Sequence, residues 1–251
     1  MLSSFIIRYH TRRLDNLLQT LRFLERWHSP VIKQSEVHLL CHDRCGPIKT
    51  GFRKTYNYNM ELSEMGMAKQ LNFGVEKSNA DIIVLLDSDR VLSEGYYERV
   101  LDKIQEKQMY SCLRMVRVTR MVADEDIISC QYPSYKEWRS MTNESLSRNI
   151  FSGNVTFLKS DFYECGCADE GYVGYGWEDH DMTKRMEKIG VKPVFVEEDL
   201  ELHLWHEFFT YGTQDQKKLF VKNGVRYCRK WKVPYPPELM QEMQNYSKFI
   251  I

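Results

Sequence analysis

Hydrophobic residues along the chain alternate between short unbroken runs and stretches with helical spacing. The clearest run is Ile82–Leu86, whose β-branched residues predict a strand buried on both faces. Upstream, Phe5–Ile7 and Val37–Leu40 predict two more strands, while Leu14–Trp27 and Met60–Ser78 have the spacing of amphipathic helices. This order of strand, helix, strand, helix, strand is typical of the nucleotide-binding half of a doubly wound α/β fold.

The rest of the chain predicts a less regular arrangement. Residues 47–59 have no clear period and are expected to form a loop, and the polar residues 119–149 are expected to form a long excursion. Further helices are expected at Glu94–Lys107, Lys159–Cys165, Glu178–Ile189, Thr213–Asn223 and Glu238–Ser247, and further strands at Met109–Val118, Ile150–Phe157, Val194–Glu197 and Leu200–His206. No glycine-rich dinucleotide or Walker loop follows the first strands, which argues against a dinucleotide-binding or P-loop enzyme.

The composition is that of an ordinary globular protein. Of 251 residues, 43% are hydrophobic, and Lys plus Arg equals Asp plus Glu at 35 each. This balance indicates no nucleic-acid partner. Without a secretory signal or a run as long as a membrane span, the chain is expected to be cytoplasmic. Peripheral membrane contact and the oligomeric state are left open.

Seven scattered cysteines are expected to be reduced thiols, because their number is odd and the compartment is reducing. His38, Cys41, His42 and Cys45 have a spacing that could suggest zinc. If His38–His42 is a strand, however, alternate side chains point to opposite faces, so core cysteines and a polar histidine are favoured.

Two acids follow the buried strand directly, in the sequence Asp87-Ser88-Asp89. In open α/β sheets, ligands bind beyond the carboxyl ends of the strands. Two carboxylates on a tight turn there form an oxygen site suited to Mg²⁺ or Mn²⁺, which commonly also holds a diphosphate. The alternative is a solvated turn that caps the following helix.

A second candidate site begins with the glycine- and aromatic-rich stretch Gly171–Trp177, whose flat apolar faces suit sugar rings. The stretch leads into a helix that starts with Glu178 and Asp179. An acid at this position is placed to act as general base, and the helix dipole is expected to keep Asp179 ionised. Pairing of Asp181 with Arg185 would leave the first two acids for the cleft. Alternatively, these are ordinary acids of a first helical turn.

Two histidines, His203 and His206, form the third candidate site. At a spacing of three on a strand they would face opposite sides, so only one is expected to reach a metal. The alternative is that both are hydrogen-bonded structural residues.

Taken in order, the three stretches resemble the GT-A glycosyltransferases over about residues 4–207. The resemblance is to inverting enzymes of the β-1,4-galactosyltransferase and chondroitin-polymerase type and to family 2 glycosyltransferases. Asp87-Ser88-Asp89 is similar to the DxD motif, and Gly176-Trp177-Glu178-Asp179 matches the Gly-Trp-Glu-Asp motif. The Gly-Gly pair that the family has after its Trp is absent. Retaining polypeptide N-acetylgalactosaminyltransferases also combine a metal-binding acid with a late histidine.

The resemblance implies a role for each candidate residue. Asp89 and His206 would hold the metal, Mn²⁺ or Mg²⁺, with His203 as the alternate ligand. Asp87 would contact the metal through water or contact the ribose. Asp179 would be the catalytic base, beside Glu178. The residues that the resemblance assigns to the donor are Arg12, Arg13, Asp43, Lys69, Asn72, Asp87, Ser88, Asp89, Gly153, Asn154 and Trp177.

We therefore expect an α/β protein with the GT-A fold: a Rossmann-like, mostly parallel sheet flanked by helices. Residues 1–207 would be the catalytic domain, with a nucleotide-binding half (1–108) and an acceptor-binding half (109–207), followed by a helical extension (208–251). The expected reaction is metal-dependent transfer of a hexose, galactose or N-acetylgalactosamine, from a UDP-sugar to a glycan or glycoconjugate hydroxyl, with inversion. The alternatives are a nucleotidyltransferase, whose glycine-rich first loop is missing here, and a non-catalytic carbohydrate-binding domain.

Overall fold

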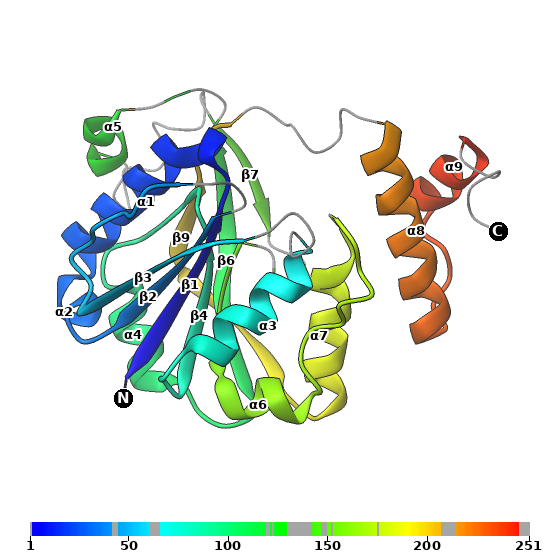
Figure 1. Cartoon of the computed structure of the whole chain (residues 1–251), viewed down its shortest axis with the longest axis horizontal. Coiled ribbons are helices and arrows are strands. Elements are labelled where there is room, and N and C mark those ends of the chain that lie inside the picture. Colours follow the sequence, from blue (N-terminus) through cyan, green and yellow to red (C-terminus); the bar gives the residue numbers. More distant parts are fainter. Residues whose placement is uncertain are drawn as a thin grey trace.

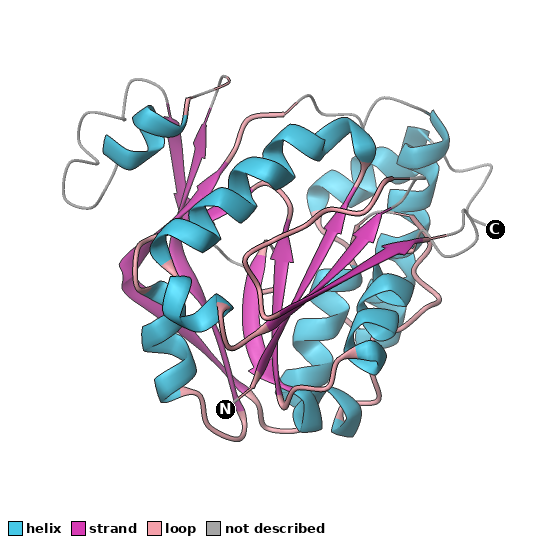
Figure 2. Ribbon diagram, turned by 60° about the vertical axis from the view of Figure 1, so that its left-hand side comes forward, coloured by secondary structure: helices cyan, strands magenta, loops and turns pink. Residues whose placement is uncertain are grey.

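A computed structural model describes residues 2–41, 45–60, 66–118, 121, 123–129, 142–146, 150–151, 153–174, 176–206 and 214–245. In this part of the chain, helices cover both faces of one mixed sheet (Figures 1 and 2). The strands are β1 (Ser3–Tyr9), β2 (Glu36–Cys41), β3 (Lys54–Asn59), β4 (Ile82–Asp87), β5 (Arg90–Leu92), β6 (Gln108–Val118), β7 (Thr142–Leu146), β8 (Asn154–Leu158) and β9 (Lys192–His203). Their order is β3-β2-β1-β4-β8-β6-β9-β5, and β7 pairs with β6.

The helical elements mostly follow the predicted periods. They are η1 (Thr11–Arg13), α1 (Leu14–Trp27), α2 (Ser29–Ile32), α3 (Met67–Lys77), α4 (Tyr96–Lys103), α5 (Asp124–Ser129), α6 (Lys159–Glu164), α7 (Glu178–Lys188), α8 (Gln214–Trp231) and α9 (Pro237–Asn245). None of the helices in the described ranges is long and apolar enough to span a membrane.

The N-terminal half of the sheet is parallel, as expected from its strand-helix alternation. β1 pairs in parallel with both β2 and β4, and β2 pairs in parallel with β3. Alternate residues of β4 enter two different cores: Val84 packs with α1 and α4, whereas Leu85 packs with α3, α6 and α7. Burial on both faces explains why this strand is an unbroken hydrophobic run.

Two predictions about individual elements are wrong. The stretch predicted as a loop contains β3, whose sequence Lys-Thr-Tyr-Asn-Tyr-Asn lacks an apolar run because it is an edge strand with exposed positions. The two short strands predicted near the end of the sheet are one strand, β9, which pairs with β6 across a register irregularity. The polar excursion contains α5 and β7 among its described residues.

The path of the second half brings distant strand ends together. β8 runs antiparallel to β4, β6 runs antiparallel to β8, and β9 runs parallel to β6. It follows that β9 points the same way as β4, so the carboxyl ends of both strands lie at one edge of the sheet. Asp87 ends β4 and His203 ends β9, and the candidate site forms where these ends meet.

The C-terminal helices stand beside α7, on the side of the sheet away from α1 and α2 (Figure 1). They contact the rest of the chain through a small apolar cluster, in which Tyr172 packs against Val221, Tyr227, Cys228 and Leu239, and through hydrogen bonds and ion pairs. The extension therefore packs onto the glycine-rich stretch that precedes α7.

The candidate zinc group does not form from the residues that the structure describes. His38 is buried in β2, where its Nε2 lies 3.2 Å from Glu36 Oε1 and its ring stacks on Tyr56. Cys41 and Cys45 are reduced thiols, and His42 lies outside the described residues. These contacts are those of a structural histidine.

Candidate active site

Three side chains converge at the carboxyl edge of the sheet. Asp89 follows β4 and is only 2% exposed. Its Oδ2 lies 3.2 Å from His206 Nε2, 3.6 Å from His203 Nε2 and 2.9 Å from Arg13 Nη1. The two histidine Nε2 atoms are 3.0 Å apart. The Asp89 carboxylate and the two imidazoles thus lie within 3.6 Å of one another.

Backbone contacts hold this cluster in place. The amide of Leu204 donates to the carbonyl of Asp89 at 2.8 Å, which ties the end of β9 to the turn after β4. From α1, Thr20 Oγ1 donates to the Ser88 carbonyl at 3.1 Å, and Asn16 Nδ2 donates to the Trp205 carbonyl at 3.0 Å. The geometry therefore rests on contacts between segments that are far apart in the sequence.

The prediction that the two histidines face opposite ways is wrong. It assumed that both lie on one strand, but β9 ends at His203 and the chain continues to His206 without strand structure. The alternation of strand side chains then no longer applies, and both imidazoles reach Asp89.

The donor set fits a divalent cation. Asp89, His203 and His206 each offer one ligand atom, and these atoms lie within 4.8 Å of one another. An octahedral ion with bonds near 2.1 Å needs neighbouring ligands about 3 Å apart, close to the separations seen here. Carboxylate oxygen suits Mn²⁺ and Mg²⁺, and imidazole is a common ligand of transition ions, so Mn²⁺ accepts both.

The ionisation of the cluster also suits a metal. Burial opposes the charge of Asp89, but hydrogen bonds with His203 and His206 and the charge of Arg90 outweigh it and hold the pKa of Asp89 well below its ordinary value. Burial lowers the pKa of His203, which favours the neutral imidazole that ligates metals.

Asp87 lies outside this group of three. Its Oδ1 accepts a hydrogen bond from Arg8 Nη2 at 3.0 Å, and its backbone amide donates to the Gly153 carbonyl at 2.7 Å. Arg8 is buried, whereas Asp87 is half-buried. A role of Asp87 in metal or ribose binding stays a prediction.

Arg90 and Glu201 were missed by the sequence reasoning. The Arg90 guanidinium lies 3.2 Å from Asp89 Oδ1, 3.9 Å from Asp87 Oδ2 and 3.0 Å from Glu201 Oε1. Burial raises the pKa of Glu201 to about 7, against the opposing charge of Arg90. Gly153 has φ +97°, and a Cβ there would lie 2.7 Å from Arg90 Cζ, so glycine is needed beside this pair. The only sequence signal was the position of Arg90 directly after the acids.

Glu178 and Asp179 begin α7, as predicted. Glu178 is buried and Asp179 is half-buried. Burial raises the pKa of both, and the negative charge of Glu178 raises that of Asp179 further. The charges of Arg8 and Asp87 act on both acids, so the start of α7 and the end of β4 share one electrostatic environment. Burial and the charge of Glu178 thus shift the pKa of Asp179 in the direction opposite to the one expected from the helix dipole, and its ionisation at neutral pH stays a prediction.

The predicted pair of Asp181 and Arg185 is confirmed, with Arg185 Nε 2.8 Å from Asp181 Oδ2. Asp181 also accepts hydrogen bonds from Trp231 Nε1 at 2.7 Å and from Tyr172 Oη at 3.1 Å. This acid therefore joins α7, the preceding loop and α8. It leaves the first two acids of the helix for other roles.

The C-terminal extension holds the loop that carries Trp177. Asn223 of α8 donates to the carbonyls of Val173 at 3.0 Å and Gly176 at 3.1 Å. The Trp177 ring packs against Phe220 and Tyr227. The extension therefore fixes this loop through both hydrogen bonds and aromatic contacts.

The contacts of the other residues assigned to the donor do not gather them into one site among the described residues. Asn72 bridges the backbone of Ala168, with its Oδ1 2.9 Å from the amide and its Nδ2 3.0 Å from the carbonyl. Asn154 is buried, and its amide group pairs with the hydroxyls of Tyr96 and Tyr97. Arg12 is exposed on η1, Lys69 is half-buried on α3, and Asp43 lies outside the described residues. Donor contacts by these residues stay predictions.

Comparison with known families agrees with this geometry. Residues 60–162 match the model of glycosyl transferase family 2, and residues 134–207 match that of the N-terminal domain of galactosyltransferase. Together the two matches run from the start of the α3 region to just beyond His206.

Solved structures show the same fold. GalNAc-T7 with UDP, GalNAc and Mn²⁺ aligns with a TM-score of 0.64 at 15% identity, over 98% of this chain and 54% of that one. The mannosyltransferase PcManGT from Pyrobaculum calidifontis, in complex with GDP-Man and Mn²⁺, aligns with a TM-score of 0.60 at 12% identity, over 98% and 69%. S. aureus TarS aligns with a TM-score of 0.56 at 11% identity, over 100% and 43%.

The chain thus spans about half the length of GalNAc-T7. The two family matches cover both motif-bearing segments, and the structural alignments take in nearly the whole of this chain. On these grounds the chain has the GT-A fold, and both of its family matches are to glycosyltransferase models.

Proposed function

We propose that the chain transfers a hexose from a UDP-sugar to a hydroxyl of a glycan or glycoconjugate, with Mn²⁺ or Mg²⁺ held by Asp89, His203 and His206. The observation that carries this proposal is the convergence of these three side chains at the carboxyl edge of the sheet. A divalent ion held there neutralises the diphosphate of the leaving nucleotide. The Mn²⁺ and nucleotide present in GalNAc-T7 and PcManGT support the same chemistry.

The donated hexose in this proposal is galactose or N-acetylgalactosamine. The match to a galactosyltransferase model and the UDP and GalNAc in GalNAc-T7 support it. PcManGT binds GDP-Man, so the base of the nucleotide has to be tested as well as the sugar.

The protein groups divide the remaining work. Asp179 accepts the proton of the acceptor hydroxyl as the oxygen forms a bond to the anomeric carbon. The bond from that carbon to the diphosphate oxygen breaks on the opposite face, so the configuration inverts. The raised pKa of Asp179 supports this role, because a general base is most effective when its pKa approaches the working pH. Trp177 and Glu178 precede this acid in the sequence; Trp177 is assigned to the donor, and Glu178 is assigned to catalysis beside Asp179.

The division of the chain is also a proposal. Residues 1–207 form the catalytic domain, with the nucleotide in 1–108 and the acceptor in 109–207. The hydrogen bonds from Asn223 to the Trp177 loop support an acceptor-side role for the extension, residues 208–251. A cytoplasmic location stays a prediction.

A donor screen tests the proposal. The purified chain is incubated with Mn²⁺, a panel of simple glycan acceptors, and UDP-hexoses or GDP-mannose, and released nucleotide is measured. Release from a UDP-hexose that EDTA abolishes and Mn²⁺ restores is the expected result. Full activity in EDTA would contradict the proposed metal requirement. Binding of UDP without turnover for any combination of donor and acceptor would favour a carbohydrate-binding protein.

A further inference from the structure

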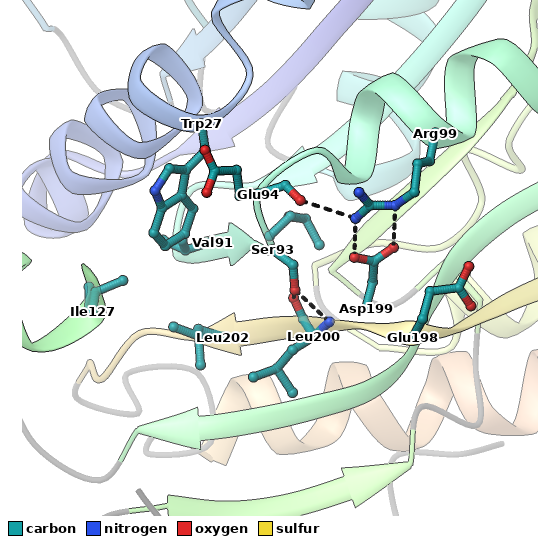
Figure 3. A pocket seen from close by; sticks show the side chains of 11 residues that line it. Trp27, Val91, Ser93, Glu94, Arg99, Ile127, Glu198, Asp199, Leu200 and Leu202 are labelled. Carbon is teal, nitrogen blue, oxygen red and sulfur yellow. Dashed lines mark hydrogen bonds and ion pairs between the residues drawn. The ribbon is translucent and has the colours of Figure 1, made fainter. Parts of the chain in front are cut away.

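A cavity lies next to the paired strands β5 and β9, which also carry Arg90 and His203 of the candidate active site. Its volume is about 440 Å³, and its lining comes from α1, β5, the loop after β5, α4, α5 and β9 (Figure 3). None of the predicted site residues lines it. The proposed transferase reaction therefore gives this cavity no role.

The register of two strands sets the position of the cavity. In the antiparallel pair of β5 and β9, Arg90 is opposite His203 and Val91 is opposite Leu202. Successive side chains of a strand point to opposite faces. Arg90 and His203 point toward Asp89, whereas Val91 and Leu202 line the cavity. The apolar floor formed by Val91 and Leu202 and the candidate metal site therefore lie on opposite faces of this strand pair.

The floor of the cavity is apolar. Trp27, Val91, Ile127, Leu200 and Leu202 line it, and all of them belong to one hydrophobic cluster and are buried. A volume of this size lies within the range of about 300–1,000 Å³ that small-ligand pockets occupy. The floor suits the apolar part of a small molecule.

The polar groups near the floor are already engaged. Ser93 donates from its amide and its hydroxyl to the Leu200 carbonyl, both at 3.0 Å. Arg99 forms a two-point ion pair with the buried carboxylate of Asp199 (Figure 3). A sugar would lack hydrogen-bond partners over such a floor, and its desolvation would be unfavourable.

The rim carries negative charge. Glu94 and Glu198 are exposed and line the cavity. Among the lining residues that the structure describes, Arg99 is the single base, and it is engaged by Asp199. A neighbouring hollow holds Arg22, which is paired with Asp124 at 2.7 Å, and the exposed side chains of Glu25 and Arg26, which are opposite in charge. The rim therefore attracts cations and repels anions.

We propose that this cavity is a binding site for a small ligand with an apolar body and a protonated amine. The apolar body covers the floor, where burial of apolar surface is favourable. The ammonium group pairs with the rim carboxylates, and the face of Trp27 adds a cation–π attraction.

Three probes of equal chain length test the charge preference: hexylammonium, 1-hexanol and hexanoate. Binding to the whole chain is followed by NMR in the absence of metal and nucleotide, using the Trp27 indole N–H signal assigned with Trp27→Phe. Hexylammonium is expected to bind in the millimolar range and at least about tenfold more tightly than hexanoate, with hexanol between them. Equal binding of the cation and the anion, or no shift of the Trp27 signal with hexylammonium, overturns the proposal.

A pair of neighbouring variants tests the rim. Glu198→Gln should weaken the binding of hexylammonium about two- to fivefold, which is the range expected for loss of an exposed ion pair. Glu197→Gln is the matched control, since Glu197 is the preceding exposed acid of β9 and does not line the cavity. Equal losses in both variants overturn the proposal. Because no donor sugar is present, the result is independent of the proposed transferase activity.

Discussion

The turn after β4 holds a buried acid, Asp89, and the first turn of α7 holds a half-buried acid, Asp179, and the pKa values of the two acids shift in opposite directions. The pKa of Asp89 is held well below its ordinary value, and the pKa of Asp179 is raised well above it. Burial disfavours the charge of both. Asp89 faces two imidazoles and two guanidiniums, whereas the neighbouring charge that acts most strongly on Asp179 is another carboxylate, Glu178.

Burial raises the pKa of both acids, and the charges of the neighbours decide whether this shift is reversed, as for Asp89, or increased, as for Asp179. An acid that stays ionised can hold a cation at any working pH. An acid that binds its proton more tightly can act as a base near neutral pH. The proposed functions of the two acids follow from this difference, and the following predictions test it.

The largest effect is expected for Asp89→Ala. Losing this carboxylate removes the anionic ligand of the proposed metal, so turnover should fall by about 10⁴-fold or more and UDP binding should lose its metal dependence. Steady-state turnover and UDP binding with and without Mn²⁺ measure it. Asp81→Ala is the control. Asp81 is an exposed acid just before β4, and its substitution should leave turnover and UDP binding unchanged. An active Asp89→Ala enzyme would remove Asp89 from the metal site.

The next largest effect is expected for Asp179→Asn, which keeps the shape and removes the base. The value of kcat should fall by about 10²–10⁴, the usual contribution of a general base, while binding of metal and UDP-sugar barely changes. Turnover and melting temperature are measured on one preparation.

Glu187→Gln, an exposed acid near the other end of α7, serves as the control for that variant. If Asp179 is merely a first-turn helix acid, its substitution changes stability by about 0.3–1 kcal/mol and leaves turnover intact. Near-normal turnover with a small shift in melting temperature would therefore reject the base assignment.

A smaller effect is expected for each histidine. Since both imidazoles reach Asp89, His203→Ala and His206→Ala should each weaken Mn²⁺ binding at least about tenfold. Titration calorimetry with Mn²⁺ on the folded variants measures this. If His203→Ala binds the metal normally, His206 and Asp89 hold the ion without it.

The smallest effect is expected for Glu178→Gln. The negative charge of Glu178 raises the pKa of Asp179, so its removal lowers that pKa, and Asp179 ionises at lower pH. The acid limb of the kcat profile should shift to lower pH while the plateau changes little. A pH–rate profile of both enzymes measures the shift. Movement of the limb to higher pH would mean that Glu178 does not act on the base through its charge.

Local patterns determined much of this protein. The run Ile82–Leu86 predicted a strand buried on both faces, and the acids after it predicted a site at the carboxyl edge of the sheet. The motif from Gly176 to Asp179 predicted the start of a helix that carries acids. These inferences hold because hydrophobic period, turn residues and helix-start residues act over a few neighbouring positions.

The remaining features depended on contacts between distant segments. β8 runs antiparallel to β4, and as a result β9 ends at the same edge of the sheet as β4. Because β9 ends at His203, both histidines can reach Asp89. Arg90 and Glu201 meet only through the pairing of β5 with β9, and Asn223 reaches the Trp177 loop only after α8 docks. The direction of the pKa shift of Asp179 likewise depends on burial and on charges from several elements. The sequence by itself determined which chemical groups are present and what lies next to them along the chain. Only the tertiary structure decided which of those groups meet, because convergence depends on strand direction and packing across the whole sheet.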